Sequence, residues 1–213
     1  MRALAASLLL ALAAMIGGST LSFAQTIKIV ALGDSLTAGF GLTGQEALPA
    51  QLEAALKRRG HDVEIANAGV SGDTASGGLA RVDWSVPDGT DAVILALGAN
   101  DMLRGVDPAV TKKALGDAIR RLRARNIDVM IAGMRAAPNL GADYAKKFDA
   151  MYEELAREYG VLLYPFLLDG VAAQRELIMA DGLHPTAKGV SVMVERILPS
   201  SESLIERVKK RRG

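Results

Sequence analysis

The residue of this chain best placed for chemistry is a serine in a glycine-rich turn. Ser35 lies in the stretch Leu32-Gly33-Asp34-Ser35-Leu36-Thr37-Ala38-Gly39, directly after an apolar run, Ile27 to Leu32, that is typical of a buried strand. Parallel α/β sheets carry their reactive side chains just beyond the carboxyl ends of strands. A serine is a weak nucleophile until a neighbouring base takes its proton. Ser35 is therefore a candidate nucleophile that needs a base.

Histidine supplies the candidate base. The chain has two histidines, and one of them, His184, lies in Asp181-Gly182-Leu183-His184-Pro185, far from Ser35 in the sequence. Each of these two segments can also be explained by a purely structural role. A Gly-Asp-Ser turn is a common loop composition, and Asp-x-x-His can form a helix cap or half of a metal site. Taken together, the two segments favour a serine hydrolase.

Two further loops follow predicted strands and offer hydrogen-bond donors. They are Asn67-Ala68-Gly69-Val70-Ser71-Gly72-Asp73-Thr74 and Leu97-Gly98-Ala99-Asn100-Asp101. Attack on an acyl carbonyl creates an oxyanion, which preorganised donors must stabilise. The backbone N–H groups of Ser35 and Gly72 and the side-chain amide of Asn100 are three such donors. The sequence predicts that they form an oxyanion hole.

Strand-like and helix-like segments alternate along the chain. Short apolar runs predict strands at 26–32, 62–67, 92–97, 128–133 and 161–164. Amphipathic periodicity predicts helices at 48–59, 108–125, 144–159 and 187–198, with the last one ending near Pro199. This alternation is typical of a five-stranded parallel sheet in a three-layer α/β/α domain.

The four loops in this order resemble the GDSL, or SGNH, hydrolase family. The four marker residues of that family match Ser35, Gly72, Asn100 and His184, and its third triad member matches Asp181. The resemblance implies a flavodoxin-like fold and a Ser35–His184–Asp181 triad that works without a metal or cofactor. Further blocks are similar to the periplasmic multifunctional acyl-CoA thioesterase/lysophospholipase/arylesterase group of the family: Ser71-Gly72-Asp73-Thr74, Gly78-Leu79-Ala80-Arg81 and Leu103-Arg104-Gly105.

Two departures from that group are visible. Ala99 stands where the group usually has glycine, so its methyl group is expected to narrow the oxyanion pocket or to shift the loop. The segment Gly39-Phe40-Gly41-Leu42-Thr43-Gly44 differs in detail and is expected to reshape the acyl pocket.

Residues 1–24 have the pattern of a secretory signal peptide. A positive start at Arg2 precedes an apolar run, and Ser22-Phe23-Ala24 places small residues at the two positions that determine cleavage. A membrane anchor is the alternative, but the run is short for a span of about 20 residues and is interrupted at 17–20. We therefore expect cleavage before Gln25, a single domain over 25–213 and a periplasmic or secreted protein without a stable membrane anchor.

Charge and cysteine content narrow the classes of partner. Without residues 1–24, which carry one charged residue, Lys plus Arg falls from 25 to 24 and equals Asp plus Glu. A formal charge of zero gives no electrostatic case for a nucleic-acid partner. The basic tail at 207–212 is expected to be a solvated, frayed end. The chain has no cysteine, which excludes thiol catalysis and zinc–thiolate sites. We expect a monomer whose partner is a small acyl ester or thioester.

Five residues in or near the predicted site loops are candidates for substrate contacts: Leu103, Arg104, Met134, Leu140 and Leu183. The four apolar side chains among them are suited to line an acyl groove, and Arg104 is a candidate contact for a phosphate or CoA headgroup. This favours an esterase or thioesterase, with lysophospholipids and aryl esters among its candidate substrates. Two alternatives stay open. A short polar pocket would favour a carbohydrate O-deacetylase. A catalytically silent periplasmic binding module is the other, although the intact Ser35, Asn100, Asp181 and His184 argue against it.

Overall fold

The computed structural model describes residues 25–213, so the predicted signal peptide lies outside the described residues. The elements in chain order are β1 (Ile27–Gly33), α1 (Ser35–Ala38), α2 (Leu48–Arg58), β2 (Val63–Gly69), α3 (Ala75–Ser85), β3 (Ala92–Ala96), α4 (Ala99–Leu103), α5 (Pro108–Ala124), β4 (Asp128–Ala132), η1 (Pro138–Leu140), α6 (Ala142–Tyr159), β5 (Leu162–Tyr164) and α7 (Ala187–Arg212).

The five strands form one parallel sheet in the order β2-β1-β3-β4-β5. All five residues of β3 are buried, because β3 lies in the centre of the sheet and is covered on both faces. Strand order changes direction between β1 and β3, and loops beyond the carboxyl ends of the strands meet at such a point. The prediction of a five-stranded parallel α/β fold is confirmed.

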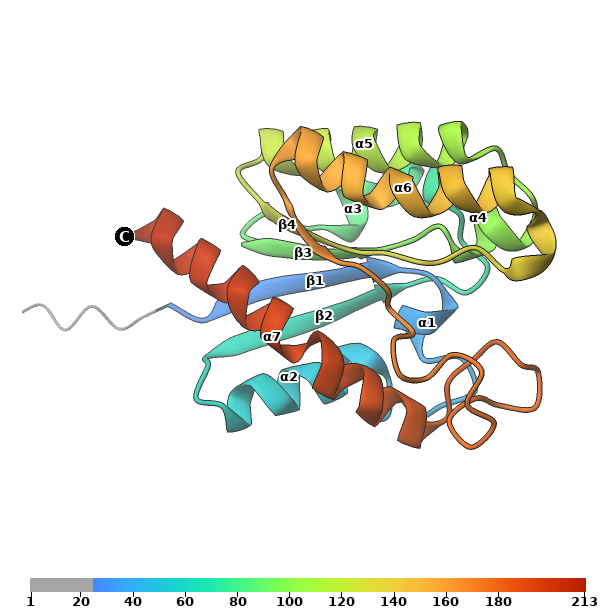
Figure 1. Ribbon diagram of the computed structural model, residues 1–213. Coiled ribbons are helices and arrows are strands. Elements are labelled where there is room, and N and C mark those ends of the chain that lie inside the picture. The colour runs from blue at the N-terminus through green and yellow to red at the C-terminus, as the bar shows by residue number, and fades with distance from the viewer. Residues whose placement is uncertain (1–24) are drawn as a thin grey trace, which may run out of the picture.

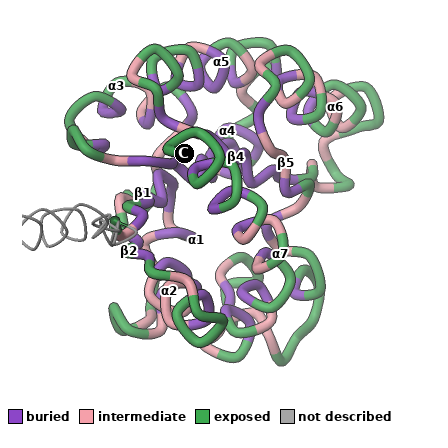
Figure 2. Tube along the Cα trace, turned by 90° about the vertical axis from the view of Figure 1, so that its left-hand side faces the viewer, coloured by how far each residue is buried: buried purple, intermediate pink, exposed green. Residues whose placement is uncertain are grey.

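Helices cover both faces of the sheet, as Figure 1 shows. Helices α2 and α7 pack together on one face, and α3, α5 and α6 pack on the other. Each long helix turns a buried stripe inward and an exposed one outward (Figure 2). The short helices α1 and α4 lie at the carboxyl edge of the sheet, beside the long irregular loop that follows β5. No helix of residues 25–213 has the length and apolar composition needed to cross a membrane.

Helix α3 was not predicted, because it contains two glycines and so lacks a clear amphipathic pattern. Thr74 caps it, since its side chain accepts a hydrogen bond from Gly77 N. A Cβ at Gly78 would lie 2.2 Å from the side chain of Leu97. The low helix propensity of glycine is therefore tolerated here because it allows α3 to pack closely against the loop that follows β3.

The prediction that the last helix ends near Pro199 is wrong: α7 runs through the proline to Arg212. A proline inside a helix costs about 3 kcal/mol or more. Beyond it, Leu204, Ile205 and Val208 are fully buried. Burial of each such side chain contributes about 1.5–3 kcal/mol, so together they outweigh the cost of the proline.

The basic tail is also not the frayed end that its composition suggested. Arg212 forms a bidentate pair with Asp91, at 3.0 and 2.6 Å, and Arg211 Nε donates to Asp128 at 2.9 Å. Asp91 is buried and also accepts from the backbone of Lys28, at the start of β1. The two arginines thus fasten the end of α7 to the amino edge of the sheet.

We predict that Arg212→Ala lowers the free energy of unfolding by about 1–3 kcal/mol, because it leaves the buried Asp91 carboxylate without its bidentate partner. Urea unfolding measures the change. The matched control is Lys210→Ala, which removes an exposed cation from the same helical turn and should change stability by less than about 0.5 kcal/mol. Equal effects of the two substitutions would show that the pair with Asp91 contributes nothing specific.

Candidate active site

Ser35 is the first residue of α1, immediately beyond the carboxyl end of β1. Asp34 caps this short helix, because its side chain accepts from Leu36 N at 3.0 Å. Gly39 ends the helix in the left-handed conformation, and its N–H donates to the carbonyl of Ser35. The first N–H groups of a helix have no partner within the helix, so the Ser35 N–H is available to a bound group.

The structure brings His184 and Asp181 to Ser35 from the other end of the chain. His184 Nε2 lies 2.9 Å from Ser35 Oγ, and His184 Nδ1 lies 2.6 Å from Asp181 Oδ2. Asp181 Oδ1 also accepts from the backbone N–H groups of Leu183 and His184. These bonds, the one from the His184 ring first among them, lower the pKa of Asp181 to about 2.

The charge state of Asp181 fixes the direction of the hydrogen bonds. A carboxylate only accepts, so Nδ1 of His184 carries the proton and donates it to Asp181. Nε2 is then left to accept from the Ser35 hydroxyl. This is the tautomer in which an imidazole can take a proton from a serine.

Gly72 and Asn100 also lie near Ser35. Together with Ser35 and His184 they line one cavity, which is described below. Gly72 has a φ of 82°, and its carbonyl accepts from Arg104 Nη2 at 2.7 Å, which fixes the peptide group between Gly72 and Asp73. The amide of Asn100 donates to Asp34 Oδ2 over 3.4 Å. An amide nitrogen has two N–H groups, so one of them remains for a ligand.

A buried arginine connects the two strand ends that carry these groups. The guanidinium of Arg81 donates to the carbonyls of Gly33 and Ala68, each at 2.8 Å, and to Asp73 at 2.7 Å. Gly33 lies two residues before Ser35 in the sequence, and Asp73 directly follows Gly72. Arg81 was noted in the sequence only as part of a family-like block, and nothing in the local pattern revealed its contacts.

A second buried contact fixes α4, which carries Asn100. Asp101 is buried and accepts from Ala75 N at 2.8 Å and from Thr111 Oγ1 at 3.0 Å. It thereby joins α4 to the start of α3 and to α5. Asp101 and Asp73 are thus held in networks that fix loop geometry.

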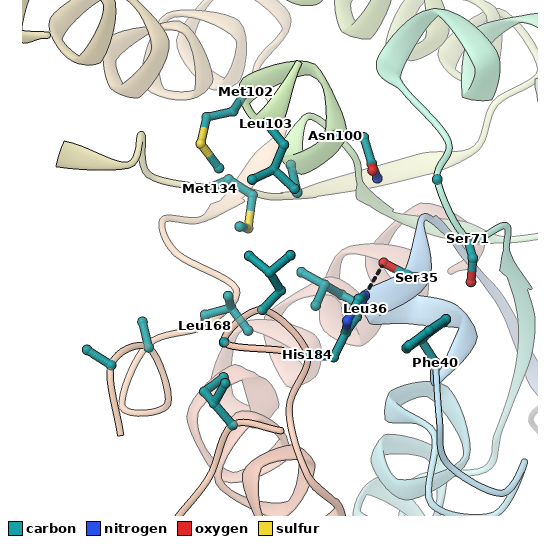
Figure 3. A pocket seen from close by; sticks show the side chains of 17 residues that line it. Ser35, Leu36, Phe40, Ser71, Asn100, Met102, Leu103, Met134, Leu168 and His184 are labelled. Carbon is teal, nitrogen blue, oxygen red and sulfur yellow. Dashed lines mark hydrogen bonds between the residues drawn. The ribbon is translucent and has the colours of Figure 1, made fainter. Parts of the chain in front are cut away.

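A cavity of about 340 Å³ opens at Ser35 and is mainly apolar (Figure 3). A cavity of this size is suited to a small-molecule ligand. The apolar side chains of its wall are Leu36, Phe40, Met102, Leu103, Met134, Leu168, Ile178 and Leu183. Ala99 also lines it, so the methyl group that replaces glycine there faces the ligand space.

Three of the five predicted substrate contacts, Leu103, Met134 and Leu183, line this cavity. The structure does not place Leu140 and Arg104 in its wall. Leu140 is the last residue of η1 and packs against the core. The Arg104 side chain is used to hold the carbonyl of Gly72. Sequence position predicted the loop but not the direction of these two side chains.

Phe40 belongs to the segment that was expected to reshape the acyl pocket, and it lines the cavity. Its contact with the base was not predicted: its ring stacks on the imidazole of His184, with ring centroids 4.3 Å apart and an interplanar angle of 29°. Within residues 25–213, no cluster of three or more His, Cys, Asp or Glu side chains is arranged to hold a metal ion.

Comparisons with known proteins agree with this geometry. Residues 31–192 match the family model of the GDSL-like lipase/acylhydrolase family. The chain therefore belongs to this family, and the prediction of a GDSL hydrolase is confirmed.

Individual relatives cover most of the chain. An arylesterase of Vibrio mimicus is 39% identical over 74% of this chain and 80% of its own length. Thioesterase 1/protease 1/lysophospholipase L1 of Escherichia coli K12 is 33% identical over 78% of this chain and 79% of its own. The crystal structure of TesA superposes with a TM-score of 0.79 at 34% identity, covering 84% of this chain and 99% of that one.

The environment of Asp34 generates a prediction on stability. Burial raises the pKa of Asp34 from 3.8 to about 6, against the opposing effect of hydrogen bonds from Leu36 and Asn100 and of the charge of His184. A carboxyl group whose pKa is raised by folding stabilises the fold fully below its unfolded pKa. That contribution is lost as the pH rises through the folded value.

We predict that Asp34→Asn removes this pH dependence. Relative to the variant, the wild-type protein should lose up to about 3 kcal/mol of unfolding free energy between pH 4 and pH 7. Asparagine can still accept the cap bond from Leu36, so the local turn is kept. Urea unfolding of both proteins at several pH values measures the difference, and parallel stability profiles would contradict the prediction.

Proposed function

We propose that this protein hydrolyses carboxylic esters and thioesters of acyl chains by forming an acyl-enzyme on Ser35. One observation carries the proposal. The chain of hydrogen bonds from Ser35 through His184 to Asp181 opens directly into an apolar cavity. The chain belongs to the GDSL hydrolase family. Its relatives at 39% and 33% identity are named as an arylesterase and as a thioesterase/protease/lysophospholipase.

The mechanism follows from the donors and acceptors. His184 Nε2 takes the hydroxyl proton as Ser35 Oγ attacks the carbonyl carbon, and Asp181 stabilises the imidazolium that results. The tetrahedral oxyanion is stabilised by the N–H groups of Ser35 and Gly72 and by the amide of Asn100. The imidazolium returns its proton to the leaving alcohol or thiol. Water, activated by the same imidazole, then releases the acid from Ser35.

The apolar lining of the cavity favours a longer acyl chain over the acetyl group of a sugar. Its wall carries leucine, methionine and isoleucine side chains from α4, from the end of β4 and from the loop before α7. Burying an alkyl chain against them contributes about 0.8 kcal/mol for each methylene group. A carbohydrate ring would need polar partners that these residues do not offer.

The place of action is part of the proposal. The signal-peptide pattern of residues 1–24 supports export to the periplasm or the medium, with cleavage before Gln25. The remaining chain, one domain over 25–213, then acts on small acyl esters as a monomer, and lysophospholipids are among its candidate substrates.

We predict that Ser35→Ala abolishes hydrolysis of p-nitrophenyl esters, because the hydroxyl is the attacking group. A fluorophosphonate probe should label Ser35 of the wild-type protein and leave the variant unlabelled. Circular dichroism provides the control for folding. Labelling of a different serine, or full activity of the folded variant, would overturn the assignment. A panel of esters from acetate to dodecanoate, with acyl-CoA and lysophospholipid, tests the preference for long acyl groups.

We predict that Asn100→Ala lowers kcat by about 10²–10³-fold with a smaller effect on KM, because the amide acts mainly on the oxyanion of the transition state. Steady-state kinetics on the preferred ester measures both constants. A loss that appears only in KM would make Asn100 a residue of ground-state binding instead.

A further inference from the structure

Phe40 is a large aromatic residue that stays nearly half exposed, at 48%, although it lies beside the site. Its principal aromatic contact is the imidazole of His184, over which its ring stacks at 4.3 Å between centroids. Figure 3 shows the two rings next to each other below Ser35. The face of the ring is thus directed at the group that the proposed mechanism uses as its base.

The backbone around Phe40 is attached to both reacting segments. Phe40 N donates to the carbonyl of Ser35 at 3.1 Å. The next residue, Gly41, has a φ of 73°, and a Cβ there would lie 3.2 Å from the side chain of Met179. Met179 in turn donates its N–H to the carbonyl of His184 at 2.7 Å. Phe40 is thus bonded through its backbone to Ser35, and its neighbour Gly41 lies close to Met179 of the loop that holds the base.

The two hydrogen bonds of His184 leave one motion of its ring free. The two bonds join its two nitrogens to Asp181 and to Ser35, and an imidazole nitrogen donates or accepts along directions in the plane of the ring. They restrain rotation within the plane, but they restrain only weakly a tilt about the line that joins the nitrogens. A flat ring packed on one face opposes this tilt. An aromatic face also attracts the cation that the imidazole becomes when Ser35 attacks.

We propose that Phe40 is a positioning residue for His184: its ring keeps the imidazole aligned with Ser35 and stabilises the imidazolium of the transition state. This inference rests on the proposed function of Ser35 and His184. It assigns to the segment 39–44, which was expected from the sequence to reshape the acyl pocket, a role in the chemical step as well.

Three substitutions test the role of the aromatic face. Phe40→Leu keeps an apolar side chain and removes the ring, whereas Phe40→Tyr keeps the ring. Trp84→Leu is the matched control, because Trp84 is 74% exposed on α3 and does not line the cavity. Each protein is assayed with p-nitrophenyl acetate and p-nitrophenyl octanoate. The acetate has almost no acyl chain to contact Phe40, so it separates effects on chemistry from effects on acyl binding.

We expect Phe40→Leu to lower kcat about 2- to 10-fold for both esters, with a smaller change in KM. Phe40→Tyr should restore kcat to within about twofold of wild type, since a phenol ring has the same aromatic face. Trp84→Leu should leave both constants unchanged. A rise in KM without loss of kcat, or equal damage from leucine and tyrosine, would overturn the proposal, because Phe40 would then only shape the wall.

A spectroscopic measurement keeps the test independent of turnover. The chain has two histidines, so a His61→Gln variant assigns the proton signal of His184 Nδ1–H. This signal should be sharp in the wild type and in Phe40→Tyr, and broadened by exchange with water in Phe40→Leu. Equal sharpness in all three proteins would overturn the proposal. Failure of the proposed function is seen separately, as a wild-type protein whose Ser35 neither reacts with fluorophosphonate nor supports hydrolysis.

Discussion

The guanidinium of Arg81 is the interaction on which the geometry of the site depends. The carbonyl of Gly33, at the end of β1, accepts from Val70 N and from Arg81, and the carbonyl of Ala68, near the end of β2, also accepts from Arg81. Buried backbone carbonyls need such partners. Arg81 satisfies the carbonyls of Gly33 and Ala68 with one planar group, and Asp73 neutralises its charge. A buried cation is tolerated only when it is paired and hydrogen-bonded in this way. The consequence is that the strand end before Ser35 and the loop that carries Gly72 are held at a fixed separation, as an oxyanion hole requires.

The two aspartates near Ser35, Asp34 and Asp181, have different environments, which shift their pKa values in opposite directions. Burial raises the pKa of Asp34 to about 6, whereas hydrogen bonds from His184 and two backbone N–H groups lower the pKa of Asp181 to about 2. Asp181 is thus charged throughout the range in which an esterase works, which suits the partner of an imidazolium. Asp34 caps α1 and accepts from Asn100, so its carboxyl group links the helix that begins with the proposed nucleophile to one of the proposed oxyanion donors. The sequence Asp34-Ser35 places this link one residue away from the reacting hydroxyl.

The extent of sequence-based prediction differs between the backbone and the side chains. Apolar runs predicted all five strands. The position of Ser35 after a strand and of His184 before the last helix predicted that the two would meet at one edge of the sheet. Side-chain direction was not predictable in the same way. Leu140 and Arg104 lie in the expected region but point elsewhere, and the ring of Phe40 reaches His184 across the fold. Likewise, Pro199 predicts a helix end locally, and only the core that buries Leu204, Ile205 and Val208 explains why α7 continues.

The loop between β5 and α7 has two tasks at once. It supplies Leu168, Ile178 and Leu183 to the wall of the cavity, and it holds Asp181 and His184. Near the base its backbone is held by the bridge between Ile178 and Pro185 and by the hydrogen bond from Met179 N to the carbonyl of His184. An acyl chain that fills the cavity therefore packs against the same segment that positions the imidazole. Binding energy gained far from a reacting carbonyl raises kcat only where it is realised in the transition state, and a wall shared with the segment of the base is one structural route to that.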